Sequence, residues 1–408
     1  MAEWPIAKLY ELAAPGKNSM ATGPFGSSIG SRFFREEGVP VIRGSNLSLS
    51  VSERLIDSGI VFVDESKASE FPRSIARKGD LVFTCWGTIG QVGLIDERAR
   101  FDRYIVSNKQ MKLTPDPRAA DPLFLYYALS SPEAVAQVQG ASIGSSVPGF
   151  NLTQLRQIEI PCPPLHVQRA IAGLLGALDD KIAVNERLAD VADALAQSIF
   201  QIRAKNSRSL CMSDVLTPIL GGTPDRKIGA YWKGSVPWAS AKDVTASRAG
   251  VVLDTEEKIT ELAAEKTRAK KLPAGSVILT ARGTVGLVAR VAQPTAINQS
   301  CYAFVPGKIP ASILLHMVRA ASEHMLGISH GTVFSTVNMK TFDHVEVPAF
   351  SLRELTELDQ EISPLHQVVE ANLRESRKLA SLRDLLLPEL MSGRFRVKTA
   401  EKIVEDVT

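Results

Sequence analysis

Apolar residues recur at helical spacing along two long stretches of the chain. One series begins at Leu165 and continues in steps of three and four residues to Ile202, and the other runs from Leu352 to Leu386. Such periodicity predicts two amphipathic helices, and Pro388 is expected to end the second. Both series are close to heptad spacing, so we expect the helices to pair antiparallel as a coiled coil.

The alternative is that each helix lies separately on its own domain. The first helix covers 38 residues, 165–202, and at about 1.5 Å per residue it is about 57 Å long. That length exceeds the diameter of a domain of about 150 residues, which favours the paired arrangement.

A set of apolar and asparagine side chains is expected to pack where the two helices meet. These are Leu174, Leu178, Ile182, Asn185, Leu195, Leu358, Ile362, Leu365, Val369, Asn372 and Leu382. Asn185 and Asn372 occupy the same position beside the apolar seam. Either they are solvated at its edge, or they fix the register of the pair, as a seam asparagine can.

The regions before each helix have the pattern of short strands. Runs such as VPVIRG, DLVFT, SVILT and CYAFV are rich in β-formers and bounded by turn residues. In each region a short helical stretch follows, at 123–129 and 313–320, then a Gly/Ser/Thr loop and a last strand, QIEIP or HVEVP. The pattern predicts an α+β fold with two β-rich domains.

These two regions are copies of one another, with a period of roughly 190 residues. The recurring residues of the first copy are Gly79, Thr84, Gly87, Thr88 and Gly90, which match Gly275, Thr280, Gly283, Thr284 and Gly286 of the second. The period is too long for a solenoid repeat and indicates a duplicated domain. A duplicated domain and two antiparallel helices predict a pseudo-two-fold arrangement within one chain.

Composition places the chain among globular proteins. Of 408 residues, 45% are hydrophobic and 22% are charged, which is too apolar for a disordered chain. The apolar runs are too short to span a bilayer, and the N-terminus lacks a signal-peptide pattern. The four cysteines lie far apart, which excludes a CxxC zinc site and argues against a disulfide framework. A cytoplasmic location is expected.

The net charge of +3 neither indicates nor excludes a nucleic-acid partner, because a DNA coat protein is usually far more basic. The charge is unevenly placed. Residues 206–348 carry 16 Lys and Arg against 11 Asp and Glu, whereas residues 1–164 carry 17 of each. The second β-rich domain is therefore the more basic one.

No catalytic pattern stands out. The Gly23–Gly30 loop lacks the Lys-Ser/Thr ending of a phosphate-binding loop, and the duplicated GTxG turns are better explained as tight turns than as nucleotide sites. The six histidines have no metal-ligand spacing, and there is no GxSxG elbow. An enzyme acting by itself is the weakest hypothesis.

The long helices and the strands before them resemble a known family. The segment PPLHVQRAIA at 163–172, continuing to Asn185, is similar to the central region of type I restriction-modification specificity subunits. LLLPELMSG at 385–393 is similar to their C-terminal region, and VIRGSNL at 41–47 and the GTxG turns fit their target-recognition domains. The resemblance covers essentially the whole chain. The second helix departs from it, because its start at 350–355 lacks the Pro-Pro-Leu and Gln of the first.

The resemblance implies a division of the chain into reading and spacing elements. Target-recognition domains are expected at 1–161 and 206–349, a central long helix at 162–205, a C-terminal long helix at 350–395 and a tail at 396–408. Each domain would contact one half of a bipartite, asymmetric target on double-stranded DNA, and the helix pair would set the unspecific spacer. At about 3.4 Å per base pair, a 57 Å helix limits that spacer to roughly 17 base pairs.

The resemblance also implies partners. Two methyltransferase (modification) subunits would dock on the helices, and motor/nuclease (restriction) subunits would complete an assembly for DNA methylation and antiviral defence. This chain would be non-catalytic, with no cofactor or metal of its own. S-adenosylmethionine, ATP and Mg²⁺ would be bound only by partner subunits.

Candidate DNA contacts are polar or aromatic residues of the loops and turns of the two domains, several of them at positions where the two copies differ. In the first copy these are Ser27, Ser28, Arg43, Ser45, Asn46, Trp86, Thr88, Lys109, Ser145 and Ser146; in the second they are Lys242, Asp243, Arg282, Thr284, Asn298, Gln299, Thr332 and Ser335. Arg and Lys suit guanine, Asn and Gln suit adenine, and Asp can accept from cytosine. For each residue the alternative is a phosphate contact or no contact.

A second functional hypothesis comes from a different class. The same pattern fits a coiled-coil adaptor whose two β-rich end domains bind proteins. Co-purification with a methyltransferase and sequence-specific DNA binding by the assembly would favour the first hypothesis, and their absence would favour the adaptor.

Overall fold

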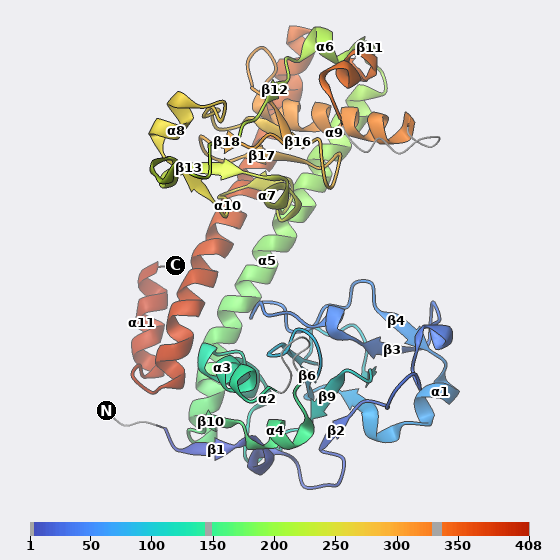
Figure 1. Ribbon diagram of the computed structural model, residues 1–408, viewed down its shortest axis with the longest axis vertical. Helices are drawn as coiled ribbons and strands as arrows, with labels where there is room; N and C mark the ends of the chain where they lie inside the picture. Colours follow the sequence, from blue (N-terminus) through green and yellow to red (C-terminus); the bar gives the residue numbers. More distant parts are fainter. Residues whose placement is uncertain (1–3, 143–148, 329–336, 408) are drawn as a thin grey trace. The chain divides into compact units, whose positions relative to one another are not determined.

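The computed structural model describes residues 4–142, 149–328 and 337–407. It contains two compact units (Figure 1). Unit 1 comprises Met1–Ile182 with Lys378–Thr408, and unit 2 comprises Ala183–Arg377. Each of the two long helices is divided between the units, so every unit contains one β-rich region and one segment of each helix.

The two long helices are α5, Leu165–Ala204, and α10, Leu352–Met391, each of 40 residues. They lie side by side (Figure 1), which confirms the predicted pair. The expectation that Pro388 ends the second helix is wrong, because α10 continues to Met391. A proline removes only one backbone donor, and the neighbouring side chains of Leu386, Leu387 and Leu390 are buried and hold this last turn in place.

The seam of α5 in unit 2 is made of small side chains followed by one large one. Ala189 and Ala192 pack in one cluster with Val369 and Leu373 of α10, and Ala196 and Phe200 in another with Leu358 and Ile362. This order is antiparallel. In unit 1 the corresponding α5 residues Ile171, Leu175, Leu178 and Ile182 share a core with α10 residues Leu379, Leu382 and Leu386.

Leu195 does not lie in this seam, because its side chain is 49% exposed. A straight helix drifts relative to a strict heptad repeat, and Ala192 and Ala196 take the seam positions that the leucine pattern suggested for Leu195. Asn185 is fully buried, and its Nδ2 donates to Oε2 of Glu375 across the seam at 2.8 Å. Asn372 instead donates to the carbonyl of Val368 in its own helix, at 2.8 Å, so only Asn185 fits the register hypothesis.

Unit 1 contains two four-stranded sheets and a two-stranded pair. One sheet has the order β2-β9-β6-β7, the next β4-β3-β8-β5, and the pair is β1-β10. The bounds are β1 Ile6–Lys8, β2 Met20–Thr22, β3 Val39–Ile42, β4 Val61–Val63, β5 Ile75–Arg77, β6 Leu81–Thr84, β7 Val92–Leu94, β8 Arg103–Val106, β9 Gln110–Leu113 and β10 Glu159–Pro161. Its shorter helices are α1 Glu65–Ser69, α2 Pro122–Leu129, α3 Pro132–Gly140 and α4 Leu152–Gln157.

Unit 2 has a five-stranded sheet in the order β12-β19-β16-β17-β14, a three-stranded sheet β15-β13-β18 and a pair β11-β20. The bounds are β11 Arg208–Cys211, β12 Ile219–Leu220, β13 Trp232–Ala239, β14 Val251–Val252, β15 Lys258–Ile259, β16 Val277–Thr280, β17 Val288–Val291, β18 Ala296–Ile297, β19 Cys301–Phe304 and β20 Glu346–Ala349. Its shorter helices are α6 Met212–Val215, α7 Ala241–Thr245, α8 Glu261–Lys266 and α9 Ala311–Ile328. The strands predicted from VPVIRG, DLVFT, SVILT and CYAFV are confirmed as β3, β6, β16 and β19.

Both units repeat one unusual pairing. Strand β3 runs parallel to β8, with Ile42 opposite Val106, and β13 runs parallel to β18, with Ala239 opposite Ile297. Strands β6 and β16 each pair antiparallel with two neighbours. The internal repeat seen in the sequence is therefore a repeat of strand pairing.

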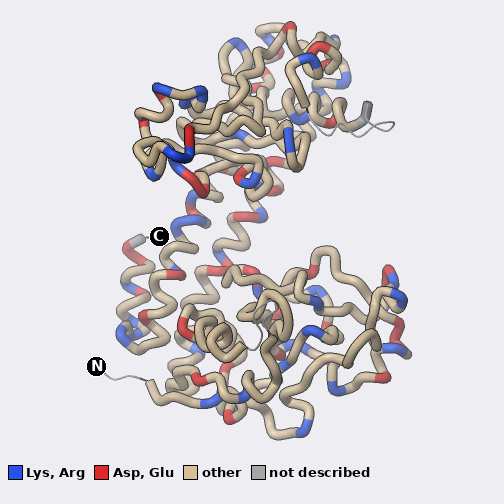
Figure 2. The backbone as a smooth tube through the Cα atoms, in the orientation of Figure 1, with Lys and Arg blue, Asp and Glu red and all other residues tan. Residues whose placement is uncertain are grey.

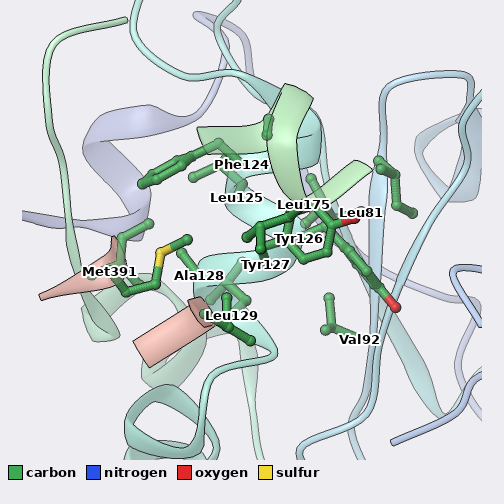
Figure 3. Close-up of a cluster of buried hydrophobic side chains, with 14 of the residues drawn as sticks. Leu81, Val92, Phe124, Leu125, Tyr126, Tyr127, Ala128, Leu129, Leu175 and Met391 are labelled. Atoms are coloured by element: carbon green, nitrogen blue, oxygen red, sulfur yellow. The ribbon is translucent and has the colours of Figure 1, made fainter. Parts of the chain in front are cut away.

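Helix α2 forms the centre of the unit 1 core. Every residue from Phe124 to Leu129 is buried, and the close-up in Figure 3 shows these side chains clustered with Leu81 and Val92 of the sheet and with Leu175 and Met391 of the long helices. A helix that is apolar on all sides is one that other elements enclose. The first unit thus packs its sheet, α2 and both long helices around one core.

The chain end forms a helix that the sequence analysis placed in a tail. Helix α11, Val397–Val407, follows a turn after α10 and lies beside it (Figure 1). Ala400 is buried in the unit 1 core, and Ile403 packs against it. The helix closes one side of that core.

A buried ionic network links the long helices of unit 1 to its sheet region. The carboxylate of Asp179 in α5, fully buried, accepts from Arg383 of α10 at 2.7 Å and from the Tyr127 hydroxyl of α2 at 2.5 Å. Arg54 lies 3.7 Å from the same carboxylate and contacts Asp96 at 2.5 Å. Burial alone would lower the pKa of Arg383, but its contacts with Asp179 and Asp384 reverse the effect and raise it. The guanidinium therefore stays charged.

Replacing Arg383 by Met is expected to destabilise unit 1 by about 3–5 kcal/mol, because Asp179 loses its closest buried counter-charge. Urea unfolding measures this loss. Adding Asp179→Asn to Arg383→Met is expected to recover part of it. The exposed pair Arg118–Asp116 provides the control, since Arg118→Met should leave the unfolding curve unchanged. Equal effects of Arg383→Met and Arg118→Met would show that the network contributes no stability.

Unit 2 has a neutral polar cluster where its helices meet. His316 of α9 lies with Nδ1 2.5 Å from Oε1 of Gln197 and Nε2 3.0 Å from Nε2 of His366 in α10. If His316 donates through Nδ1, its Nε2 accepts from His366, so two neutral imidazoles satisfy the chain of bonds. Burial, with the charges of His366 and Arg319, lowers the pKa of His316 well below 6.5; burial, with Arg290 and Arg319, lowers that of His366.

Stability of unit 2 is therefore expected to fall as the pH drops below about 6.5. Both histidines take up protons in the unfolded chain there but remain neutral when folded, so each costs up to about 1.4 kcal/mol per pH unit. Urea unfolding between pH 7.5 and 5 measures the slope. The double variant His316→Leu, His366→Leu should flatten it, whereas His166→Asn, at an exposed position, should not. A slope unchanged in the double variant would contradict the assignment.

Candidate nucleic-acid interface

Backbone hydrogen bonds bring three strand ends of unit 1 together. The amide of Ser107, after β8, donates to the carbonyl of Ile42 at the end of β3 at 2.9 Å, and the amide of Cys85, after β6, donates to the carbonyl of Lys109 at 2.7 Å. The residues that follow these strands therefore lie on one edge, although they are far apart in the chain.

A hollow of about 480 Å³ opens at this edge. It is lined by five of the predicted contact residues, Arg43, Ser45, Trp86, Thr88 and Lys109, and also by Ile29, Phe34, Gly44, Thr84, Gly87, Gln91, Ser107 and Asn108. Phe34, Thr84 and Gln91 were not among the predicted site residues. Of these, Gln91 uses both ends of its amide within the fold, because its Oε1 accepts from the Thr84 hydroxyl at 3.0 Å and its Nε2 donates to the carbonyl of Leu47 at 2.9 Å. The recurrence of Thr84 as Thr280 was the available signal for one of them; Phe34 and Gln91 carried none.

Trp86 is the large aromatic side chain of this hollow, and it is 53% exposed. One part of its ring packs against Gly149, where a Cβ would come within 2.9 Å of the indole. The guanidinium of Arg43 lies 5.6 Å from the ring of Phe34. The hollow thus combines aromatic surfaces with donors, which suits planar groups carrying hydrogen-bond acceptors.

The loop containing Ser27 and Ser28 borders the hollow. Asn108, which lines the hollow, donates from Nδ2 to the carbonyl of Gly26 at 2.8 Å, and the hydroxyl of Ser28 donates to the carbonyl of Phe25 at 2.7 Å. Ser27 is exposed and Ser28 half-buried. The bonds hold the loop tip in place, with Phe25 74% exposed.

Asn46 is buried and serves the turn. Its Oδ1 accepts from the amide of Arg43 at 3.0 Å, and its Nδ2 donates to the carbonyl of Ile56 at 2.8 Å. Both ends of the side chain are therefore used within the fold, and we leave Asn46 out of the contact surface.

Unit 2 repeats the scaffold with different side chains. The amide of Asn298 donates to the carbonyl of Ala239 at 2.9 Å, and the amide of Ala281 donates to the carbonyl of Ser300 at 2.8 Å. These bonds correspond to those of Ser107 and Cys85 in unit 1. Arg282, Thr284 and Gln299 are exposed on this edge.

The remaining predicted residues of unit 2 take part in internal contacts. Lys242 is exposed but forms an ion pair with Glu256 at 2.6 Å. Asp243 accepts from the amides of Ser240 and Glu256, each at 2.8 Å, and so occupies the place of Asn46 in unit 1. The Oδ1 of Asn298 accepts from the amide of Ser300 at 3.0 Å.

Four predicted contact residues lie outside the described residues: Ser145 and Ser146 of the first copy, and Thr332 and Ser335 of the second.

A family model described as the type I restriction modification DNA specificity domain matches the chain twice, over residues 34–192 and 205–379. Together the two matches cover most of the sequence. The chain belongs to this family. This match confirms the resemblance to type I restriction-modification specificity subunits seen in the sequence.

Known relatives agree with this assignment. The MjaIX specificity subunit of Methanocaldococcus jannaschii is 28% identical over 165 residues, which are 40% of this chain and only 38% of that protein. The HindI specificity subunit of Haemophilus influenzae is 20% identical over 375 residues, covering 72% of this chain and 81% of that one. The crystal structure of a type I S subunit from M. genitalium has a TM-score of 0.59 at 14% identity, covering 95% and 96% of the chains, and is similar in fold.

Two buried thiols of this specificity subunit, those of Cys85 and Cys301, are unsuited to nucleophilic chemistry. Cys85 directly precedes Trp86, and burial raises its pKa to about 12. Burial, with the charge of Asp243, raises the pKa of Cys301 to about 12 as well. Both thiols therefore stay protonated at neutral pH.

Two kinds of feature are absent from the described residues. No cluster of three or more His, Cys, Asp or Glu side chains suited to a metal ion lies among residues 4–142, 149–328 and 337–407. Within the same ranges, no helix has the length and apolar character needed to cross a membrane.

The charges of the specificity subunit are mixed along the backbone (Figure 2). In unit 2 the side chain of Arg282 is exposed, and it forms no hydrogen bond or ion pair among the described residues. Other basic side chains are neutralised within the fold, as Arg226 is by Glu257 at 2.8 Å. The net charge of the whole chain is only +3, but the edge that carries Arg282 offers an exposed guanidinium. This edge is therefore a candidate for a phosphate or base contact.

Proposed function

We propose that this chain is the sequence-specific DNA-recognition subunit of a type I restriction-modification complex. Unit 1 contacts one half of a bipartite, asymmetric target and unit 2 contacts the other. The observation that carries the proposal is the duplicated strand-end scaffold, which presents Trp86 in one unit and Arg282 in the other. Equivalent positions with different chemistry are what two different half-sites require.

The proposed base contacts follow from side-chain chemistry. Arg43 and Lys109 in unit 1 and Arg282 in unit 2 suit guanine acceptors, and Gln299 suits adenine. Ser45, Thr88 and Thr284 can each donate to or accept from a base or a phosphate. Lys242 would first have to leave Glu256, so we assign it to phosphate rather than to base contact.

The helices are proposed to set the spacer and to dock methyltransferase subunits. A helix of 40 residues is about 60 Å long, which corresponds to at most about 18 base pairs of unspecific DNA. On α5 in unit 2, an apolar stripe stays exposed outside the seam: Val184, Leu188, Val191, Leu195 and Ile202. Exposed apolar residues at helical spacing suit the packing of a partner helix.

The proposed assembly assigns chemistry to the partners. Methyltransferase subunits would bind the methyl donor S-adenosylmethionine, and restriction subunits would use ATP and Mg²⁺. This chain would contribute recognition and no catalytic group. Recognition by one subunit and catalysis by others lets a single pair of half-sites direct both methylation and cleavage.

The deciding experiment is sequencing of methylated bases in host DNA with and without the gene for this chain. We expect one split motif, with an unspecific spacer of no more than about 18 base pairs, to lose methylation. Purification with neighbouring gene products should also yield a methyltransferase bound to this chain. Unchanged methylation in the deletion strain would contradict the proposal and favour a protein adaptor.

Replacing Arg282 by Ala is expected to relax sequence preference at one half-site only. The expected loss on the cognate site is about 1–3 kcal/mol of binding free energy, with a smaller loss on sites altered at the base that it contacts. Anisotropy of labelled duplexes, with this chain assembled with its methyltransferase, measures it. Trp86→Ala is the matched variant in the other unit. If Arg282→Ala weakens binding equally on all sequences, Arg282 contacts phosphate.

Placing Glu at Leu188 and Leu195 is expected to weaken methyltransferase docking at least tenfold, because the exposed stripe would no longer bury apolar surface. Gel filtration and calorimetry with the purified methyltransferase measure the loss. Leu49→Glu makes the same chemical change at an exposed loop position of unit 1 and should leave the complex intact. Normal docking by the double variant would exclude this face of α5 as the docking site.

A further inference from the structure

The unit 1 hollow has features that groove contact alone does not require. Contact with base edges or phosphates needs donors on an exposed edge. Here the donors surround a concavity of about 480 Å³, a size typical of sites that hold a whole small organic group. An aromatic side chain lines it, and its polar groups come from three separate strand ends.

Several polar groups of the hollow have no partner in the described chain. The side chains of Ser45, Thr88 and Lys109 make no internal hydrogen bond or ion pair among the described residues. The Nε of Arg43 is screened from solvent and also lacks a partner. A buried donor without an acceptor lowers the stability of the folded state. A ligand with acceptor atoms would remove this cost by hydrogen-bonding to the donor.

Trp86 is placed to stack on a planar ligand. Its packing against Gly149 requires glycine there, since a Cβ would lie only 2.9 Å from the indole. The contact fixes one part of the ring while the side chain remains half-exposed at the hollow. Stacking on an aromatic ring with hydrogen bonds at the edges is how proteins hold a base outside the helix.

The exposed Phe25 provides a second, independent feature. It lies at the tip of a loop whose Ile29 lines the hollow and whose Gly26 is bonded to Asn108. Gly23 at the base of this loop packs so closely that a Cβ would lie 1.8 Å from the carbonyl oxygen of Ser107. A rigidly supported, exposed phenyl ring suits insertion between base pairs, where apolar wedges unstack a step.

Unit 2 lacks this combination. Gly221 has the same close packing as Gly23, because a Cβ there would lie 2.1 Å from the carbonyl oxygen of Asn298. Two residues later the chain has Thr223 where unit 1 has Phe25, and Arg282 stands in the place of Trp86. The scaffold is shared, but the aromatic pair belongs to unit 1 alone.

We propose that the unit 1 hollow binds one nucleobase turned out of the DNA duplex, stacked on Trp86, while Phe25 enters the stack beside it. The inference rests on the proposed function, since it requires that unit 1 contacts a DNA half-site. It adds that this half-site is read partly through the ease with which one base leaves the helix. Unit 2 reads its half-site without extruding a base.

The test is a mismatch scan with the chain assembled with its methyltransferase. Each position of the unit 1 half-site is mispaired in turn by changing only the opposite base, and binding is measured by anisotropy. Extrusion from a mismatch needs less unpairing energy, so binding should strengthen about tenfold or more at one position. Trp86→Ala should abolish that gain, and Trp86→Phe should keep most of it. Phe25→Ala should reduce it.

The control variants separate this inference from the function on which it rests. Arg282→Ala should weaken binding to the matched and the mismatched duplex alike, so the ratio of the two affinities should not change, because Arg282 lies in the other unit. A gain that persists in Trp86→Ala comes from base extrusion by the methyltransferase and would overturn the inference. No gain at any position, with specific binding to the matched duplex intact, would overturn it as well. If the assembly with the unaltered chain showed no specific binding to the matched duplex, the proposed function itself would be overturned.

Discussion

The buried carboxylate of Asp179 is the contact that joins the pieces of unit 1. It lies on α5, yet its hydrogen-bond partners come from α2 and α10, and Arg54 of the sheet region lies beside it. An isolated carboxylate at such depth would be costly. Two guanidinium groups and a phenol surround this carboxylate and stabilise its charge. They can do so only while the elements that carry them keep their positions. The strand-end edge of unit 1 is thus held in a fixed position relative to the helix segments of the same unit.

Unit 2 solves the same packing problem with different chemistry. Where α5, α9 and α10 meet, the neutral imidazoles of His316 and His366 contact each other, and Arg319 binds Asp193 at 2.9 Å. Duplication therefore preserved the backbone scaffold and left the polar junctions free to diverge. The same difference is seen at the strand-end edges, where Trp86 and Arg282 lie on equivalent turns. The proposed recognition of two unlike half-sites would use this shared strand pairing with different side chains.

Much of the architecture was predictable because it depends on periodicity. Helical spacing located α5 and α10, and the repeat located the strand ends, so five of the predicted residues line one hollow. The errors came from properties that depend on three dimensions. Leu195 has the spacing of a seam residue, but small alanines occupy the seam instead. Asn46 has the chemistry of an adenine contact, but the turn uses both ends of its amide.

The sequence by itself determined the α+β class, the duplication, the two long helices and the family, since each follows from local pattern or from repeated motifs. Only the tertiary structure decided which polar residues are available to a ligand. Asp243 and Asn298 carry suitable groups, yet their side-chain oxygens accept from backbone amides within the fold. Phe25 and Phe34 gained their roles only through folding. The physical reason is that hydrogen bonding saturates: a donor or acceptor satisfied within the fold is lost to the ligand, and the partner that satisfies it can be distant in sequence.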